Sequence, residues 1–159
     1  MPDMLEAGSL APEFELPWLD GGSARLSDLI PEEGLLVAFF KVSCPTCQLT
    51  LPFLDRLEQA KNTGARIVLV SQDDGPSTRQ FHQAFEISIP TLLDPSRENY
   101  PASNAFHIHH VPSMFWVEPG RRISWADQGF RKAGFEELAP KFGALPWRPG
   151  DDVPEWRAG

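Results

Sequence analysis

The chain has 159 residues, of which 42% are hydrophobic and 23% are charged. These proportions are typical of one domain with its own apolar core, and they exclude disorder, collagen-like chains and repeat arrays. The formal net charge of -8 opposes the approach of phosphate backbones, so we expect no nucleic-acid partner. The two cysteines are too few for a disulfide-stapled scaffold.

The N-terminal segment predicts neither export nor membrane insertion. Residues 1–6 are acidic and lack a basic stretch followed by an apolar one. The longest apolar run of the chain, residues 35–40, is far shorter than the roughly 20 residues that a spanning helix needs. We therefore expect a cytoplasmic protein without a membrane span. An exported protein whose signal had been removed would give the same pattern.

The first 40 residues carry the pattern of a β-hairpin followed by a buried strand. Residues 14–16 alternate apolar and polar side chains, residues 20–22 form a turn signal, and residues 24–26 can pair back. A short helical turn is expected at 27–29. The continuously apolar run 35–40 then predicts a central strand that is buried on both faces.

Helix signals follow this strand directly. Pro45 suits the first helical position, Cys44 is placed as the N-cap, and Gly64 is placed to end the helix. Apolar residues recur at three- and four-residue spacing and give the helix one buried face. They are Leu49, Phe53, Leu54, Leu57 and Ala60.

Strands and helices alternate from there to residue 142. This alternation predicts an α/β fold with a mixed central sheet that helices flank on both sides. The expected strands are 67–70, 90–94, 114–117 and 123–125, the last of them antiparallel, and the expected helices are 76–85, 98–106 and 133–142.

The C-terminal residues 143–159 differ in amino-acid composition from the domain formed by residues 1–142. Prolines and glycines break regular structure there, and Trp147 and Trp156 are isolated aromatic residues. We expect the two indole rings to pack against the domain and so hold the tail on its surface. The alternative is that the tail binds a partner or a second copy of the chain.

The motif Cys44-Pro45-Thr46-Cys47 lies where a buried strand ends and a helix begins. At the helix start, free N–H groups and the positive end of the helix dipole stabilise a thiolate on Cys44. Cys47 shares the same helical face, so the two sulfurs can form a disulfide. We predict that Cys44 attacks a target disulfide and that Cys47 resolves the mixed disulfide. Half of a zinc site and a pair of structural thiols are the alternatives.

These motifs resemble the thioredoxin-like superfamily, and within it the TlpA/ResA-like thiol–disulfide oxidoreductases of the redoxin (AhpC/TSA) group. The resemblance covers residues 8–142 and rests on residues 8–14, on 35–47, on Asp94 and on Val111-Pro112-Ser113. It implies a thioredoxin-like fold with an N-terminal hairpin extension. It also implies an enzyme with no cofactor or metal beyond a redox-active Cys44–Cys47 disulfide, with protein disulfides as substrates and an external thiol reductant as partner.

The resemblance also assigns residues to the substrate surface. In the family a cis proline lies beside the two cysteines, and Pro112 matches its position. The backbone of Val111 would then pair with an extended substrate segment. Pro45 and Thr46, which lie between the cysteines, are expected to contact the substrate as well.

One departure from the family pattern bears on how Cys47 loses its proton. Ala38 stands where thioredoxins have a buried aspartate, so the acceptor cannot come from that strand. The TlpA/ResA branch offers an acidic residue after the next strand, and Asp74 matches it, with Asp73 adjacent. We therefore predict a catalytic role for Asp74. The alternative is that both aspartates form a turn that caps the next helix.

Three histidines, His107, His109 and His110, cluster just before Pro112. The resemblance places His109 and His110 at the border of the active-site surface, and we predict that His110 contacts the substrate. These histidines could instead join the cysteines as metal ligands, or form a polar loop without a further role.

Two rival functions stay open beside the protein disulfide oxidoreductase, for which a reductase role is expected. A peroxiredoxin-like thiol peroxidase shares the fold, but its reactive cysteine follows a Ser or Thr by three positions. Lys41 holds that position before Cys44, and Cys44 holds it before Cys47. The other rival is a non-enzymatic Cys/His metal-binding module. The sequence predicts no oligomeric state.

Overall fold

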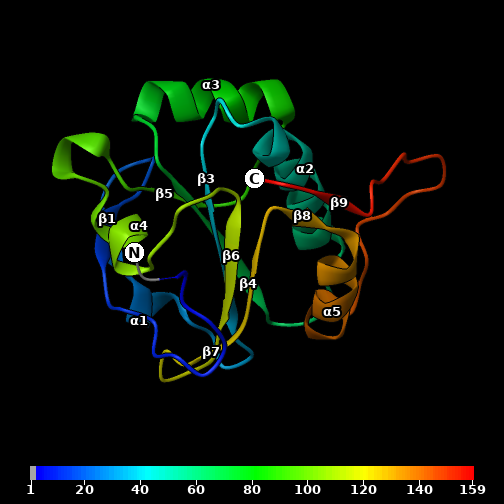
Figure 1. Ribbon diagram of the computed structural model, residues 1–159, viewed down its shortest axis with the longest axis horizontal. Coiled ribbons are helices and arrows are strands. Elements are labelled where there is room, and N and C mark those ends of the chain that lie inside the picture. Colours follow the sequence, from blue (N-terminus) through cyan, green and yellow to red (C-terminus); the bar gives the residue numbers. More distant parts are fainter. Residues whose placement is uncertain (1–2) are drawn as a thin grey trace.

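The computed structural model describes residues 3–159, and its centre is β3 (Leu35–Phe40), whose six residues are all buried. From edge to edge, the five-stranded sheet consists of β5 (Thr91–Leu93), β4 (Arg66–Ser71), β3, β6 (Ser113–Val117) and β7 (Ile123–Gln128) (Figure 1). β3, β4 and β5 run parallel, whereas β6 and β7 pair antiparallel. The prediction of a mixed sheet around the strand 35–40 is therefore confirmed.

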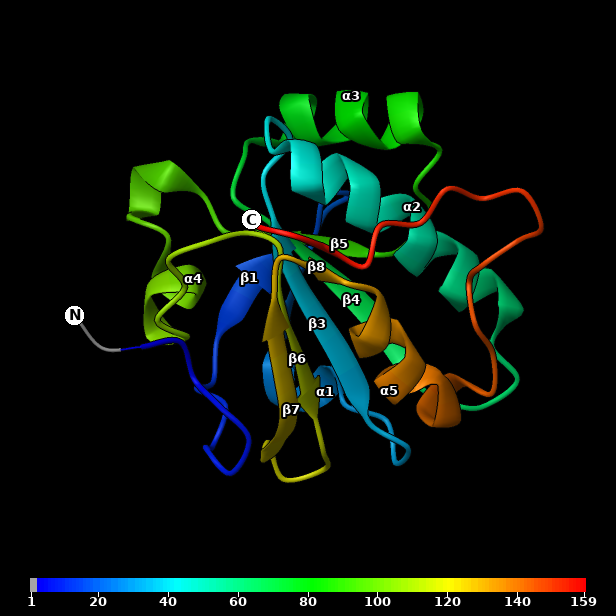
Figure 2. The same cartoon turned by 45° about the vertical axis from the view of Figure 1, so that its right-hand side comes forward.

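Helices cover both faces of this sheet, as the alternation of elements predicts. They are α1 (Leu26–Leu29), α2 (Pro45–Ala60), α3 (Gly75–Phe85), α4 (Pro101–Ala105) and α5 (Lys132–Phe142). Figure 2 shows α2 and α5 to one side of the sheet and α4 to the other. Within residues 3–159, no helix is long and apolar enough to cross a membrane.

The core has two halves, because successive side chains of a strand point to opposite faces. Leu36, Ala38 and Phe40 of β3 pack in a cluster with residues of α2, α3 and α5. Leu35, Val37 and Phe39 pack in a second cluster with residues of α1 and α4. The end of β3 is thereby fixed from both sides, and the cysteine motif follows directly after it.

The N-terminal hairpin is present as predicted. β1 (Glu15–Pro17) pairs antiparallel with β2 (Ser23–Arg25), with Leu16 opposite Ala24. The buried side chain of Leu16 joins the cluster on the α1 side of the sheet. The hairpin thus extends the apolar layer that packs on the α1 side of β3.

Two helices differ from the sequence prediction in their bounds. α2 ends at Ala60, before Gly64, and the N–H of Asn62 donates instead to the carbonyl of Phe142 in α5 at 3.0 Å. α2 thus ends before Gly64, and the chain beyond it contacts α5 instead of continuing as a helix to the glycine. The expected helix 98–106 is divided into a 3₁₀ turn, η1 (Ser96–Glu98), and α4. Positive φ angles at the two residues before Pro101 separate them.

The C-terminal tail folds back onto the domain, and the sequence predicted only one of the two contacts that hold it there. The indole ring of Trp147 packs against the rings of Phe53 and Phe135, with centroids 5.0 and 5.2 Å apart, as expected. The expectation was wrong for Trp156, whose residue is 64% exposed. Backbone pairing holds that end of the tail instead, between β8 (Phe130–Arg131) and β9 (Trp156–Arg157).

Candidate active site

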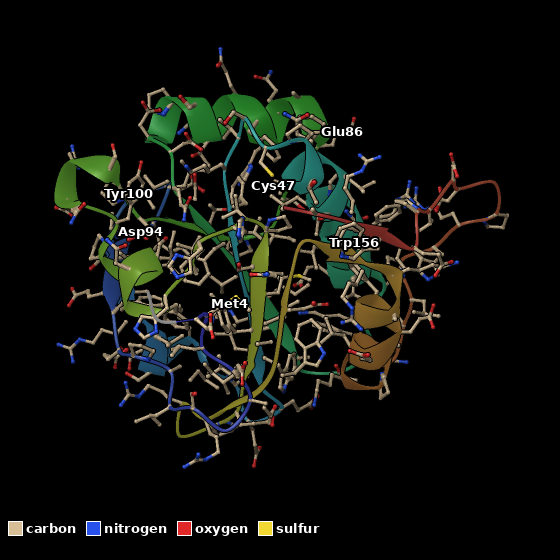
Figure 3. The ribbon with its side chains drawn as sticks, in the orientation of Figure 1. Met4, Cys47, Glu86, Asp94, Tyr100 and Trp156 are labelled. Carbon is tan, nitrogen blue, oxygen red and sulfur yellow. The ribbon has the colours of Figure 1, made fainter. Side chains whose placement is uncertain are left out.

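Cys44 and Cys47 occupy the start of α2, directly after β3 and the turn that follows it. Figure 3 shows Cys47 at this helix start. Cys44 is the N-cap, and its sulfur accepts a hydrogen bond from the N–H of Cys47 at 3.1 Å. Both are free thiols; Cys44 is half-buried, and Cys47 is fully buried. A substrate can therefore reach Cys44 first, while Cys47 lies behind it, which is the order that the sequence predicts.

The segment around Pro112 lies against Cys44, although 67 positions separate Val111 from Cys44. The Cys44 thiol donates to the carbonyl of Val111 at 3.4 Å, and the Val111–Pro112 peptide bond is cis. Ser113, the first residue of β6, pairs with Phe39 of β3 and donates its hydroxyl to the carbonyl of His110 at 2.6 Å. The central sheet thus holds this segment and the cysteine motif side by side.

Cys47 lies in an apolar environment. Burial raises the pKa of its thiol well above the usual range, and the hydrogen bond with Cys44 and the negative charge of Asp73 act in the same direction. Ala38, at the position where thioredoxins have an aspartate, belongs to the same buried cluster. Cys47 is therefore a neutral thiol at neutral pH, and it must lose its proton before it can attack a disulfide.

The two aspartates after β4 have different surroundings. The exposed Asp74 is the N-cap of α3: its carboxylate accepts from the N–H of Ser77 at 2.8 Å, which lowers its pKa. The carboxylate of Asp73 accepts from the N–H of Val42 at 2.8 Å, in the turn between β3 and the cysteines. The structure thus places Asp74 in the helix cap that was the alternative to its predicted role, and brings Asp73 to the cysteine turn.

This difference leads to a prediction about Cys47. Asp73→Asn is expected to lower the pKa of the Cys47 thiol, because the substitution removes a negative charge that disfavours the thiolate. The amide oxygen of asparagine can still accept from Val42, so the turn is retained. The ultraviolet absorbance of the thiolate, followed across the alkaline range in a Cys44→Ala background, reports this pKa. The titration should begin at lower pH than in the parent.

Asp74→Asn is the matched control, since it changes the neighbouring charge at a position that faces Ser77. Its Cys47 titration should match that of the parent. A titration unaltered by Asp73→Asn, or shifted equally by both substitutions, would contradict the assignment of Asp73 to the cysteine site.

The remaining predicted substrate residues lie around Cys44. Pro45 is exposed, and His110 is exposed beside Val111 at a hollow of about 190 Å³ that Lys41 also lines. His107 lies apart from this hollow, with its ring 3.3 Å from the carbonyl of Asp3. Within residues 3–159, no three His, Cys, Asp or Glu side chains form a group that could hold a metal ion.

Thr46 has surroundings that the sequence did not indicate. It is only 4% exposed, and its hydroxyl donates to the carbonyl of Ala158 at 2.6 Å. The tail thus reaches the cysteine motif, 112 positions away in the chain. The sequence carries no local signal for this contact, because it depends on backbone pairing of two short segments.

Comparisons with known proteins agree with this geometry. The model of the AhpC/TSA family matches residues 7–126. The thiol–disulfide oxidoreductase ResA of Geobacillus kaustophilus is 27% identical over 118 residues, which are 73% of this chain and 66% of that protein. The chain therefore spans just under two thirds of this relative. Peroxiredoxin Bcp of Escherichia coli K12 is 28% identical over 91 residues, which are 57% of this chain and 58% of that protein.

The fold has solved counterparts as well. A thiol:disulfide interchange protein from a Bacteroides species superposes with a TM-score of 0.72 at 21% sequence identity, over 88% of this chain and 92% of that one. At this identity the likeness establishes the thioredoxin-like fold with its hairpin and mixed sheet. The segment that matches the family model, residues 7–126, makes up more than half of the chain and contains both cysteines and the cis Val111–Pro112 bond, so the chain belongs to the AhpC/TSA family.

Proposed function

We propose that this chain reduces disulfides in proteins through Cys44 and Cys47. One observation carries the proposal. A half-buried thiol at a helix start contacts the Val111 carbonyl, and the N–H of a second, buried cysteine donates to its sulfur. This arrangement provides an accessible nucleophile and a protected resolving thiol, both of which disulfide exchange requires.

The reaction has two exchange steps. The Cys44 thiolate attacks one sulfur of the target disulfide; a mixed disulfide forms, and the other target sulfur leaves as a thiolate that takes up a proton. Cys47 then loses its proton and attacks the Cys44 sulfur, and the second target sulfur leaves. Two electrons pass to the target, and a Cys44–Cys47 disulfide remains. Since the chain has two cysteines, an external thiol must reduce this disulfide.

Several residues support these steps in the proposal. The backbone of Val111, next to Pro112, pairs with an extended segment of the target, and Pro45, Thr46 and His110 form the rim around Cys44. Asp73 is the carboxylate that accepts the proton of Cys47, the role predicted for its neighbour Asp74. The hydrogen bond from Val42 supports this choice, since it holds the Asp73 carboxylate at the cysteine turn.

Reduction is the proposed direction. A dithiol becomes a strong oxidant when its reduced form is stabilised, for example as a thiolate. Burial and the charge of Asp73 both disfavour the Cys47 thiolate, as the raised pKa indicates, so the reduced pair gains no such stabilisation from this residue. We propose accordingly that the protein works in a reducing compartment such as the cytoplasm.

A thiol peroxidase is the second candidate, favoured by the likeness to peroxiredoxin Bcp. The two reactions can be separated by one experiment. The fully reduced protein is mixed with equal concentrations of hydrogen peroxide or of insulin, and the loss of the Cys44 and Cys47 thiols is followed over a single turnover by alkylation and peptide mass, so that thiols released on insulin are not counted. We expect faster oxidation by insulin, since Lys41 replaces the hydroxyl residue that peroxiredoxins have three positions before the reactive cysteine. Faster oxidation by peroxide would favour the peroxidase.

A further inference from the structure

The last residues of the tail lie on the surface where Cys44 is reached. Figures 1 and 2 both show the C-terminal end of the chain beside the start of α2. β9 pairs with β8 up to the Phe130–Arg157 pair, and the next residue, Ala158, accepts the hydroxyl hydrogen bond of Thr46. Gly159 then lies against Val111 so closely that a Cβ on Gly159 would overlap the Val111 carbonyl.

These contacts reach both segments that border Cys44. Thr46 belongs to the cysteine motif, and the Val111 carbonyl is the one that accepts from the Cys44 thiol. Thr46 is only 4% exposed although it follows the exposed Pro45 in the first turn of α2. Residues 156–159 therefore occupy the same surface that an incoming protein segment must contact to bring its disulfide to Cys44.

The contacts of residues 156–159 are made mainly through the backbone. β9 pairs antiparallel with β8 along the backbone. Gly129, which lies beside β8, approaches Arg157 so closely that a Cβ on Gly129 would come within 2.7 Å of the Arg157 carbonyl. The side chain of Trp156 points outward and is largely exposed (Figure 3). Backbone pairing depends little on side-chain identity, so an extended segment of another protein can form the same contacts.

The tail is also anchored in a way that allows its end to leave. Trp147 is packed in the aromatic cluster of Phe53 and Phe135 and keeps the start of the tail in place. Beyond it, residues 156–159 are exposed and form a two-residue strand pair and one hydroxyl hydrogen bond. A segment with so few buried contacts opens at small cost in free energy.

We propose that β8, Thr46 and Val111 border a groove that binds an extended segment of the protein substrate, and that residues 156–159 fill this groove until the substrate displaces them. The proposal rests on the proposed function in one respect only: the molecule that displaces residues 156–159 is taken to be a protein whose disulfide Cys44 reduces. The occupied groove itself is independent of the reaction that Cys44 performs.

Three variants test the proposal. A chain without residues 155–159 removes the occupant and keeps Trp147. Gly159→Val keeps the length but introduces a side chain that overlaps Val111, so it should displace the end of the tail. Ala158→Val is the matched control, because it adds the same side chain one position earlier, at an exposed residue. Thermal unfolding shows whether each variant is folded; if the shortened chain is not, Gly159→Val carries the test.

Two readouts are compared with the full chain. The first is the rate constant for alkylation of Cys44 by a bulky maleimide, with the modified residue identified by peptide mass. The second is kcat/KM for reduction of insulin with dithiothreitol as reductant. Both should rise by about tenfold in the shortened chain, because the competent open state is no longer a minor population. Gly159→Val should give a smaller rise, and Ala158→Val should match the parent.

The outcomes separate this proposal from the proposed function. Equal alkylation rates in the full chain, the shortened chain and Gly159→Val would overturn the proposal. Faster alkylation with unchanged kcat/KM would overturn the competition with substrate. Faster alkylation in chains that all fail to reduce insulin would support the tail as the occupant of the groove and reject the proposed function.

Discussion

Cys44→Ser is expected to lower the rate of insulin reduction by about 1,000-fold or more, to the background of dithiothreitol alone. The reason is that Cys44 is the thiol at the surface, whereas Cys47 is fully buried and cannot replace it. The serine hydroxyl can still accept from the N–H of Cys47, so the helix cap is retained. Turbidity of precipitating insulin measures the rate.

Cys47→Ser is the matched variant, with the same change at the second position of the motif. It should lose turnover as well, but for a different reason, since Cys44 can still attack while no second thiol of this chain resolves the intermediate. When the reduced variant is mixed with insulin in the absence of dithiothreitol, a covalent complex through Cys44 should accumulate and be visible by mass on a non-reducing gel. Turnover in Cys44→Ser equal to that of the parent would refute a redox role for this cysteine.

Asp94→Ala is expected to destabilise the fold by about 4 kcal/mol, the largest effect on stability that we predict for a residue outside the apolar core. Asp94 is fully buried after β5 (Figure 3). Its carboxylate accepts from the N–H groups of Ala102 and Ser103 at 2.9 and 2.7 Å and from the Ser103 hydroxyl at 2.5 Å. Alanine leaves three buried donors without this acceptor.

Thermal unfolding measures this effect. For a chain of this size the midpoint should fall by about 10 °C. Asp152→Ala removes an exposed aspartate from the tail and should leave the midpoint unchanged. An Asp94→Ala midpoint equal to that of the parent would mean that the hydrogen bonds of Asp94 to Ala102 and Ser103 contribute little to the fold. Activity at low temperature should persist in Asp94→Ala, because the cysteine motif is not altered.

The sequence predicted those parts of the fold that have strong local signals. The unbroken apolar run of β3 and the proline at the start of α2 fix both the central strand and the position of the cysteines. Short elements with weak patterns were less predictable. The division of 98–106 into η1 and α4 depends on Asn99 and Tyr100, whose left-handed backbone conformation the sequence did not indicate.

The two cysteines of the site could be predicted from the sequence, but the contacts of the residues around them could not. Asp73 and Asp74 are adjacent and chemically identical, and only the direction of each side chain decides which one caps α3 and which one faces Val42. The contact of Thr46 with Ala158 depends on where a tail of irregular sequence returns. Such long-range backbone contacts have no local sequence pattern, so the structure was needed to find them.

In the proposed function, Cys44 and Cys47 act together as one dithiol toward protein disulfides. Stoichiometric transfer of electrons tests it most directly: the reduced chain is mixed with insulin in the absence of other thiols, and free thiols are counted on both proteins. We expect this chain to lose two thiols while insulin gains two, and peptide mass to identify a Cys44–Cys47 disulfide. Full retention of both thiols, with insulin unreduced, would contradict the claim.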